Sequence, residues 1–412
     1  MLLNRGRNSV AIPGPSIIPD RVLAAMQRPS PNIYDGELID IAESIFPDLK
    51  SVARTDGNVA IYIANGHGSW EAGISNVLSP GDRVIALNTG FFGSRWAFMA
   101  RTMGIDVEVL DFGMDECFDP GVLRNRLGAD TSPYVKAVFA VQTDTASSVR
   151  NDIPELRAVL DDVGHESLLM VDCIASLGCE PHEMDAWGVD VMNAACQKGL
   201  MTPAGMSFVY FNDRAKEARA RVSGVSGYWD WVPRTEPEHF YQLFGGTAPT
   251  HHIFALREAL DILVHEEGVA NAWARHERLA GAVWAAIDRW ADGSTIRPGV
   301  SDPSHRSHAV TTIRTTNDLS GGHDGDTDAD RIRQWCESRS GVTLGIGLGF
   351  PDHLSGSAFR IGHMGHLNPP MILGTLGCVD SALTALGIPH GDGALEAASR
   401  VISEADATFG LE

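Results

Sequence analysis

Lysine is scarce in this sequence, which makes the place of one lysine informative. Of 412 residues only four are lysine, and Lys50, Lys136 and Lys216 lie where lysine is ordinary, in charged helix-like stretches or at the start of an apolar strand. Lys198 instead lies among small and weakly polar residues, in a segment (194–199) that we expect to be buried. Burial disfavours the charged ammonium, lowers the pKa of the lysine and makes its amine a nucleophile.

Other absences exclude whole classes of protein. No two cysteines form a closely spaced CxxC pair, so we expect neither a disulfide framework nor a metal site, and reduced thiols as in a cytoplasmic protein. No apolar run reaches the roughly 18 residues that span a bilayer, and the N-terminus lacks the apolar core of a signal peptide, so no membrane partner is expected. A formal net charge of -21 argues against nucleic acid or an anionic membrane as partner. The six cysteines are Cys117, Cys173, Cys179, Cys196, Cys336 and Cys378.

The length and the order of apolar runs predict a two-domain α/β protein. With 44% apolar and 21% charged residues, the composition is that of a soluble globular chain, and 412 residues suit one large and one smaller domain. Strand-like runs alternate with helix-like stretches, which predicts a mostly parallel seven-stranded sheet flanked by helices. We expect its strands at 59–64, 83–87, 106–110, 135–141, 168–172, 191–194 and 206–211, and its helices at 69–79, 94–103, 119–127 and 153–164.

The rest of the chain divides into an arm, a connecting helix and a small domain. We expect residues 1–30 to be an arm that packs onto the body or onto a partner, and 31–265 to be the large domain. Residues 266–290 continue a long helical pattern and connect to a small C-terminal α+β domain, 291–412. In that domain we expect strands at 308–315 and 359–361 and helices at 328–338, 371–386 and 393–408.

Two residues near predicted strand ends carry most of the chemical information. The apolar strand 168–172 ends in Asp172, which alone is either a helix cap or a site residue. Lys198 follows about two strands later, and in a parallel sheet both then lie at the same edge. A buried lysine forms a Schiff base with a carbonyl cofactor such as pyridoxal phosphate, and a carboxylate facing the pyridine nitrogen keeps that nitrogen protonated. The pair indicates this chemistry more specifically than either residue alone.

Two further segments suit the anionic groups of such a reaction. Residues 63–71 contain a glycine turn before a helix, whose amides and dipole favour a phosphate; a tight turn without a ligand is the alternative. Arg360 lies in the apolar strand 359–361, where it either clamps a substrate carboxylate or forms a structural salt bridge. The glycine-rich run 345–349 lacks the βαβ context of a dinucleotide loop, so we expect a flexible turn there and no Rossmann dehydrogenase.

With these motifs the chain resembles the class V aminotransferases, pyridoxal-phosphate enzymes of fold type I that include the alanine–glyoxylate and serine–glyoxylate aminotransferases. The resemblance runs nearly end to end. Its most specific motifs are Val171-Asp172-Cys173-Ile174-Ala175-Ser176-Leu177-Gly178 and Gln197-Lys198-Gly199-Leu200. It also includes Pro13-Gly14-Pro15-Ser16, Gly66-His67-Gly68-Ser69-Trp70-Glu71, Phe91-Phe92-Gly93-Ser94-Arg95-Trp96 and Phe359-Arg360-Ile361-Gly362-His363.

The resemblance implies a role for each matching residue. Lys198 is the Schiff-base lysine and proton shuttle, Asp172 pairs with the pyridine nitrogen, and Arg360 holds the substrate carboxylate. The other matches surround the cofactor: Gly66, His67, Gly68 and Gln197 at the phosphate, Phe92 stacked on the ring, Thr145 beside the ring oxygen, and Thr247 reaching the phosphate across the interface of a homodimer. Three places depart from the pattern: Gln142 to Ser148 lose the family's histidine and glycine, 31–36 replace its His-Arg pattern, and Phe244 stands where relatives have a tyrosine that contacts the cofactor. These changes leave the amino-acid specificity open.

The activity that the resemblance implies is a ping-pong amino transfer. A small L-amino acid such as serine, alanine or aspartate, or a less common amine such as ureidoglycine, donates to a 2-oxo acid such as glyoxylate or pyruvate. The alternative is a lyase of the same fold, such as a cysteine desulfurase, which typically has a histidine before the lysine and a reactive cysteine on a loop; here Gln197 precedes Lys198. A protein that binds the cofactor without turnover is disfavoured because both Lys198 and Arg360 are present.

Overall fold

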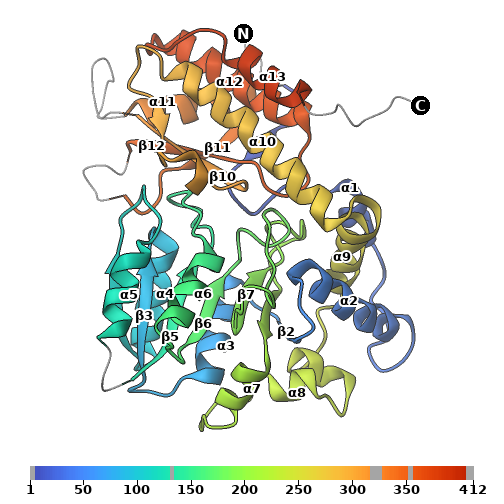
Figure 1. Ribbon diagram of the computed structural model, residues 1–412. Helices are drawn as coiled ribbons and strands as arrows, with labels where there is room; N and C mark the ends of the chain where they lie inside the picture. The colour runs from blue at the N-terminus through green and yellow to red at the C-terminus, as the bar shows by residue number, and fades with distance from the viewer. Residues whose placement is uncertain (1–4, 130–133, 316–326, 351–355, 405–412) are drawn as a thin grey trace.

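Two β-sheets, each with helices packed on it, form the body of the protein (Figure 1). The computed structural model describes residues 5–129, 134–315, 327–350 and 356–404. The larger sheet has seven strands in the order β2-β8-β7-β6-β5-β3-β4. Every neighbouring pair is parallel except the two pairs that β8 makes, with β2 and with β7. The strands are β2 (Asn58–Tyr62), β3 (Arg83–Asn88), β4 (Asp106–Asp111), β5 (Val135–Val141), β6 (Leu168–Asp172), β7 (Val191–Ala195) and β8 (Ser207–Phe211).

Burial on both faces explains why these strands read as continuous apolar runs. Along β5 and β6, successive residues enter two different clusters of the core: Val138 and Leu169 belong to one, Phe139 and Met170 to the other. Side chains alternate between the faces of a strand, so each face needs its own apolar layer. The predicted mostly parallel seven-stranded sheet is confirmed. The helices between its strands are α3 (Gly66–Val77), α4 (Phe91–Thr102), α5 (Pro120–Gly128) and α6 (Ile153–Asp162), and α7 (Asp213–Arg219) follows the last strand, β8.

Several short helices lie beside this sheet in the large part of the molecule. A long helix, α2, carries buried apolar residues such as Leu38, Ile45 and Leu49 at helical spacing and packs against α9. The elements are α1 (Asp20–Ala25), α2 (Glu37–Ala53), α8 (Val232–Thr235), the 3₁₀ helix η1 (Phe240–Phe244) and α9 (Thr250–Leu260).

The smaller sheet includes the N-terminal arm. Its order is β1-β11-β12-β10-β9, and β1 pairs in parallel with β11. The predicted flexible turn at 345–349 is wrong at its start, because Gly345 and Ile346 end β11 and pair with Arg360 and Phe359. A Cβ at Gly345 would lie 2.8 Å from Cδ of Pro13, so close packing explains this glycine. The strands are β1 (Ser9–Ala11), β9 (Arg297–Pro298), β10 (Val310–Arg314), β11 (Val342–Ile346) and β12 (Ala358–Gly362).

One long helix, α10 (Val269–Trp290), runs from the large part of the molecule to the small sheet (Figure 1). A π-helical turn, η2 (Asp261–Glu267), and Gly268 at φ 83° separate it from α9. The domain boundaries at 30/31, 265/266 and 290/291 stay predictions. The remaining elements are the 3₁₀ turn η3 (Pro303–His305), α11 (Asp328–Trp335), the π-helical η5 (Cys336–Ser340), α12 (Pro369–Leu386) and α13 (Ala394–Ser403). Residues 405–408 of the last predicted helix lie outside the described residues.

Within the described residues, one helix, α12, is long and apolar enough to cross a membrane by length and composition alone. Core helices pass the same test, so this is weak evidence. Ile372, Leu376, Val379 and Leu383 of α12 are buried in the core of the small sheet, which accounts for the apolar composition of the helix.

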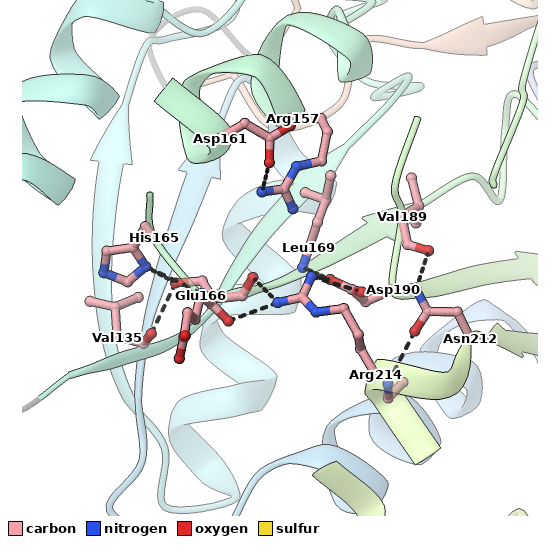
Figure 2. A network of polar contacts seen from close by, with 12 residues as sticks. Val135, Arg157, Asp161, His165, Glu166, Leu169, Val189, Asp190, Asn212 and Arg214 are labelled. Atoms are coloured by element: carbon pink, nitrogen blue, oxygen red, sulfur yellow. Dashed lines mark hydrogen bonds and ion pairs between the residues drawn. The ribbon is translucent and has the colours of Figure 1, made fainter. Parts of the chain in front are cut away.

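A buried carboxylate ties three strands of the large sheet together (Figure 2). Asp190, just before β7, accepts hydrogen bonds from the backbone N–H of Leu169 on β6 at 2.8 Å and from Nδ2 of Asn212, just after β8, at 2.8 Å. Arg214 on α7 supplies the counter-charge at 2.9 Å. Because Asp190 precedes β7 while Lys198 follows it, this network lies at the opposite sheet edge and fixes the strands that carry Asp172 and Lys198.

Candidate active site

A cavity of about 280 Å³ collects residues from the ends of three neighbouring strands. Seven of the predicted site residues line it: Gly66, His67, Phe92, Thr145, Asp172, Gln197 and Lys198. Gly68, Thr247 and Arg360 do not. The other lining residues are Gly14, Pro15, Asn65, Trp70, Val141, Thr143, Ile174, Ala175 and Ala204. Sites at the carboxyl ends of parallel strands are typical of open α/β sheets.

Lys198 is buried, as its neighbours in the sequence indicated. It is 9% exposed, and burial and the charge of Arg360 lower its pKa to about 8, against the opposing effect of Asp172. Its Nζ donates to the carbonyl oxygen of Pro13 at 2.5 Å. An amine with this pKa is neutral in roughly a tenth of molecules at pH 7, far more than an ordinary lysine, and the neutral form is the one that attacks a carbonyl.

The N-terminal arm, which the sequence predicts to pack onto the body or onto a partner, contributes Gly14 and Pro15 to the lining of the cavity. Ser16 donates through Oγ to the carbonyl oxygen of Lys198 at 2.7 Å, and its N–H donates to that of Gln197 at 2.9 Å. Gly14 has φ +93°, and a Cβ on it would lie 2.4 Å from Nζ of Lys198. Only glycine therefore leaves space for the lysine side chain at this position.

Asp172 faces the cavity from the end of β6. One strand, β7, separates it from Lys198 in the chain, and β6 and β7 are adjacent and parallel. Burial raises the pKa of Asp172 to about 7, while hydrogen bonds from the N–H of Ile174 and from Trp70 oppose that rise. The carboxyl group of Asp172 thus has a donor on each oxygen and borders the cavity.

The N-terminus of α3 lies at the cavity, which Asn65, Gly66 and His67 line. The side chain of Asn65 caps the helix by accepting from the N–H of His67 at 3.1 Å. Gly68 does not line the cavity: its N–H donates to the carbonyl oxygen of Asn65, and a Cβ on it would lie 2.5 Å from Cβ of Ala64. Burial and Arg95 lower the pKa of His67, so His67 presents a neutral ring. A helix N-terminus with these groups suits an anion.

Phe92 is placed by a buried acid that the sequence did not single out. Asp144 accepts from the N–H groups of Phe92 at 2.7 Å and Gly93 at 3.2 Å, so it caps the first turn of α4. A Cβ at Gly90 would lie 2.3 Å from the carboxyl carbon of Asp144, which requires glycine before Phe92. The segment 142–148 therefore fixes the aromatic residue of the site.

The altered segment after β5 presents threonines to the cavity. Val141, Thr143 and Thr145 line it, whereas Gln142 does not. Gln142 instead accepts from Oγ of Ser176 at 2.9 Å behind the site. Ser148, where the family pattern has glycine, keeps a left-handed backbone at φ 65°. The two departures at 142 and 148 thus lie outside the cavity lining.

Arg360 is a buried cation with no ion-paired acid among the described residues, and the buried carboxyl of Asp144 acts on it only as a nearby charge, which raises its pKa against the larger effect of burial. It is 7% exposed, and its Nη1 and Nε donate to the carbonyl oxygens of Thr145 and Ile346, each at 2.6 Å. Within the described residues no carboxylate lies at ion-pair distance from Arg360, so the structural salt bridge is not formed there. Burial lowers its pKa to about 10. Such a guanidinium is prepared to bind an anion.

Comparison with known proteins places the chain in a family. The Aminotransferase class-V family model matches residues 53–320. The chain is 33% identical over 389 residues to a serine–glyoxylate aminotransferase of Methylorubrum extorquens, covering 93% of this chain and 92% of that one. This protein belongs to the class V aminotransferases. It is also 30% identical to an L-aspartate–glyoxylate aminotransferase of Paracoccus denitrificans, with 93% of each chain covered. A crystal structure of an alanine–glyoxylate aminotransferase from Nostoc superposes with a TM-score of 0.81 at 26% identity, covering 92% of this chain and 96% of that one.

The residues of the cavity fit the cofactor on which this family depends. Four groups line the cavity, and each suits one part of pyridoxal phosphate. The amine of Lys198, with its lowered pKa, suits the carbonyl, and the buried carboxyl of Asp172 suits the pyridine nitrogen. The ring of Phe92 suits the face of the pyridine ring, and the N-terminus of α3 suits the phosphate. Thr247 is exposed in the single chain and lies outside the cavity lining. The individual roles of the site residues stay predictions.

Proposed function

We propose that this cavity holds pyridoxal 5′-phosphate and transfers an amino group from a small L-amino acid to a 2-oxo acid such as glyoxylate or pyruvate. The observation that carries the proposal is the presence of Lys198 and Asp172 in one cavity, with a lowered pKa for the amine. The serine–glyoxylate and L-aspartate–glyoxylate relatives support these substrate classes.

In this proposal each residue performs one task. The cofactor, when bound, supplies a carbonyl that reacts with amines and a ring that takes up electron density as the Cα–H bond breaks. Nζ of Lys198 removes the Cα proton of the substrate and returns it, and Asp172 holds a proton on the ring nitrogen. Arg360 orients the substrate carboxylate, and the N-terminus of α3 with Gln197 holds the phosphate.

The lyase alternative lacks a thiol in the right place. All six cysteines lie in described segments, and none of them lines the cavity. Cys173, Cys179 and Cys196 are close in sequence to the site but are fully buried, and burial raises the pKa of each thiol. A desulfurase needs a thiolate that reaches the substrate, so amino transfer is favoured.

We expect small amino acids to convert the pyridoxal form of the protein to the pyridoxamine form in a half-reaction. The enzyme is mixed with single amino acids, and loss of the pyridoxal absorption band is followed in a stopped-flow spectrometer. Serine, alanine and aspartate are the first donors, ureidoglycine a further one, and cysteine tests the lyase through its conversion to alanine, with sulfide released from the enzyme persulfide by an added thiol reductant. If no amino acid bleaches the band while cysteine is converted to alanine and sulfide is released in the presence of that reductant, the transaminase assignment is wrong.

We further propose that the enzyme is a homodimer in which Thr247 of one chain completes the phosphate site of the other. Thr247 follows η1, whose Tyr241 is 56% exposed in the single chain. Contiguous exposed apolar surface marks a site that another protein covers, and we expect Tyr241 to belong to such a surface. The arm adds Val10, 40% exposed, and α1 adds Leu23, 41% exposed.

Replacing Thr247 by alanine is expected to weaken pyridoxal 5′-phosphate binding about tenfold, because a hydroxyl-to-phosphate hydrogen bond is lost. Thr247→Ser keeps the hydroxyl and should bind as the unsubstituted enzyme does. The dissociation constant comes from absorption titration, with the oligomeric state measured in parallel by sedimentation. A monomer that binds the cofactor at full strength would contradict this shared site.

A further inference from the structure

One buried hydrogen bond joins the cavity to the core of the large sheet. Nε1 of Trp70, on α3, donates to Oδ2 of Asp172, on β6, at 2.9 Å. Trp70 is 1% exposed and Asp172 3%. Because both groups are shielded from water, no solvent molecule replaces the indole donor when it is removed.

The two oxygens of Asp172 have separate and rigid donors. Oδ1 accepts from the backbone N–H of Ile174 at 2.7 Å, and Oδ2 accepts from Trp70. One donor belongs to the chain that follows β6 and the other to helix α3. Two donors on two oxygens fix the plane of a carboxylate, whereas one donor leaves it free to rotate.

Trp70 is itself fixed by a stack of aromatic rings. Its ring lies 6.0 Å from that of Trp96 with 17° between the planes, and Trp96 lies 4.5 Å from Phe139 at 11°. On the cavity side its ring lies 4.7 Å from that of His67. The indole N–H is therefore held in one direction, toward Asp172.

We propose that Trp70 is a positioning residue whose indole N–H holds the Asp172 carboxylate in the orientation that pairs with the pyridine nitrogen of the cofactor. The inference rests on the proposed function, since it requires that ring next to Asp172. Trp70 acts through Asp172 and needs no contact with the reacting atoms.

The same hydrogen bond influences the protonation of Asp172. Burial and the nearby carboxyl of Asp144 raise the pKa of Asp172, and Ile174, Trp70 and the ammonium of Lys198 lower it. Loss of the indole donor therefore raises that pKa. A neutral Asp172 pairs less well with a protonated ring nitrogen, so the acid limb of the kcat profile moves to higher pH.

Trp96 provides a matched control for the test. It is 1% exposed and belongs to the same stack, but its Nε1 is buried without a hydrogen-bond partner. Trp96→Phe removes the same ring atoms as Trp70→Phe and no hydrogen bond, and it keeps an aromatic ring beside Trp70. We expect Trp70→Phe to weaken pyridoxal 5′-phosphate binding about tenfold and to move the acid limb upward, and Trp96→Phe to do neither.

The dependence on Asp172 is tested by a double substitution. In an Asp172→Asn background, Trp70→Phe should produce no additional loss of cofactor affinity, because the carboxylate it positions is gone. Equal affinity and equal acid limbs for Trp70→Phe and Trp96→Phe would show that Trp70 only packs, and would overturn the inference. If the unsubstituted protein bound no pyridoxal 5′-phosphate, the proposed function itself would fail.

A second measurement needs no change at Trp70, in case Trp70→Phe does not fold. The nine tryptophans give resolvable indole N–H signals when labelled with ¹⁵N. One signal should move between the unsubstituted protein and Asp172→Asn, and the same signal should move when pyridoxal 5′-phosphate is added. If the indole signal that shifts in Asp172→Asn did not shift when pyridoxal 5′-phosphate is added, the proposal would be contradicted.

Discussion

Replacing Lys198 by alanine is expected to reduce kcat/KM for amino transfer by about 10⁴-fold, the largest effect of any single substitution in this enzyme. The side chain is both the nucleophile toward the cofactor carbonyl and the base for the Cα proton, and a positioned base alone contributes about 10²–10⁴-fold. Cofactor binding should persist more weakly, because the groups placed for the phosphate and the ring remain. Absorption spectra and steady-state rates measure both effects.

The control for this substitution is another lysine of the same chain. Lys136 lies on β5 with an exposed side chain, so Lys136→Ala should leave the activity unchanged. Borohydride reduction followed by peptide mass spectrometry should find the cofactor on Lys198 in the unsubstituted protein and on no lysine in Lys198→Ala. A cofactor still reduced onto the Lys198→Ala chain would disprove the assignment.

The pH dependence of cofactor capture is a second measure of the same amine. The pKa of Lys198 is lowered to about 8 by burial first and by Arg360 second. The neutral amine is the reactive form, so capture of pyridoxal 5′-phosphate by cofactor-free protein should accelerate as pH rises through about 8 and then level off. Removing the charge of Arg360 raises the pKa of Lys198, so Arg360→Ala should move this midpoint to higher pH.

The elements of the large sheet were predictable because each strand is buried on both faces. The runs 135–141 and 168–172 coincide with β5 and β6, since a strand between two apolar layers needs apolar residues at every position. The reversal of β8 was not predictable from its own composition. It follows from the connection 196–206, which carries Lys198 and contains no helix to cross over the sheet.

The site was predictable where one residue type carries the chemistry, and not where the geometry depends on pairing. Lys198 and Asp172 are recognisable in the sequence because burying an ionisable group costs free energy unless the group has a partner or a function. The hydrogen bond from Trp70 to Asp172 joins residues far apart in the sequence, so no local sequence pattern predicts it. Gln142 and Thr143 alternate between the core and the cavity, so a change at 142 does not touch the substrate space while Thr143 borders it. β1 has three residues, too few for a sequence signal.

Replacing Arg360 by alanine is expected to lower kcat/KM for amino acids by about 100- to 1,000-fold, mostly through KM. Removing one partner of a buried charge pair costs about 2–5 kcal/mol, and 100- to 1,000-fold, about 2.7–4.1 kcal/mol, lies within that interval. The guanidinium is buried, its pKa is lowered to about 10 by burial, and its hydrogen bonds go to carbonyl oxygens of Thr145 and Ile346, so a substrate carboxylate would be its counter-ion.

A substrate that lacks the carboxylate separates this clamp from a structural role. The unsubstituted enzyme should have a much higher kcat/KM for alanine than for ethylamine. Arg360→Ala should lose most of that difference, because ethylamine has no carboxylate for the guanidinium to bind. Arg360→Lys keeps a charge without the planar fork and should recover part of it. Because Arg360 also holds Thr145, cofactor absorption is measured alongside. An equal loss for alanine and ethylamine would mean that Arg360 supports the fold between β12 and the cavity and binds no carboxylate.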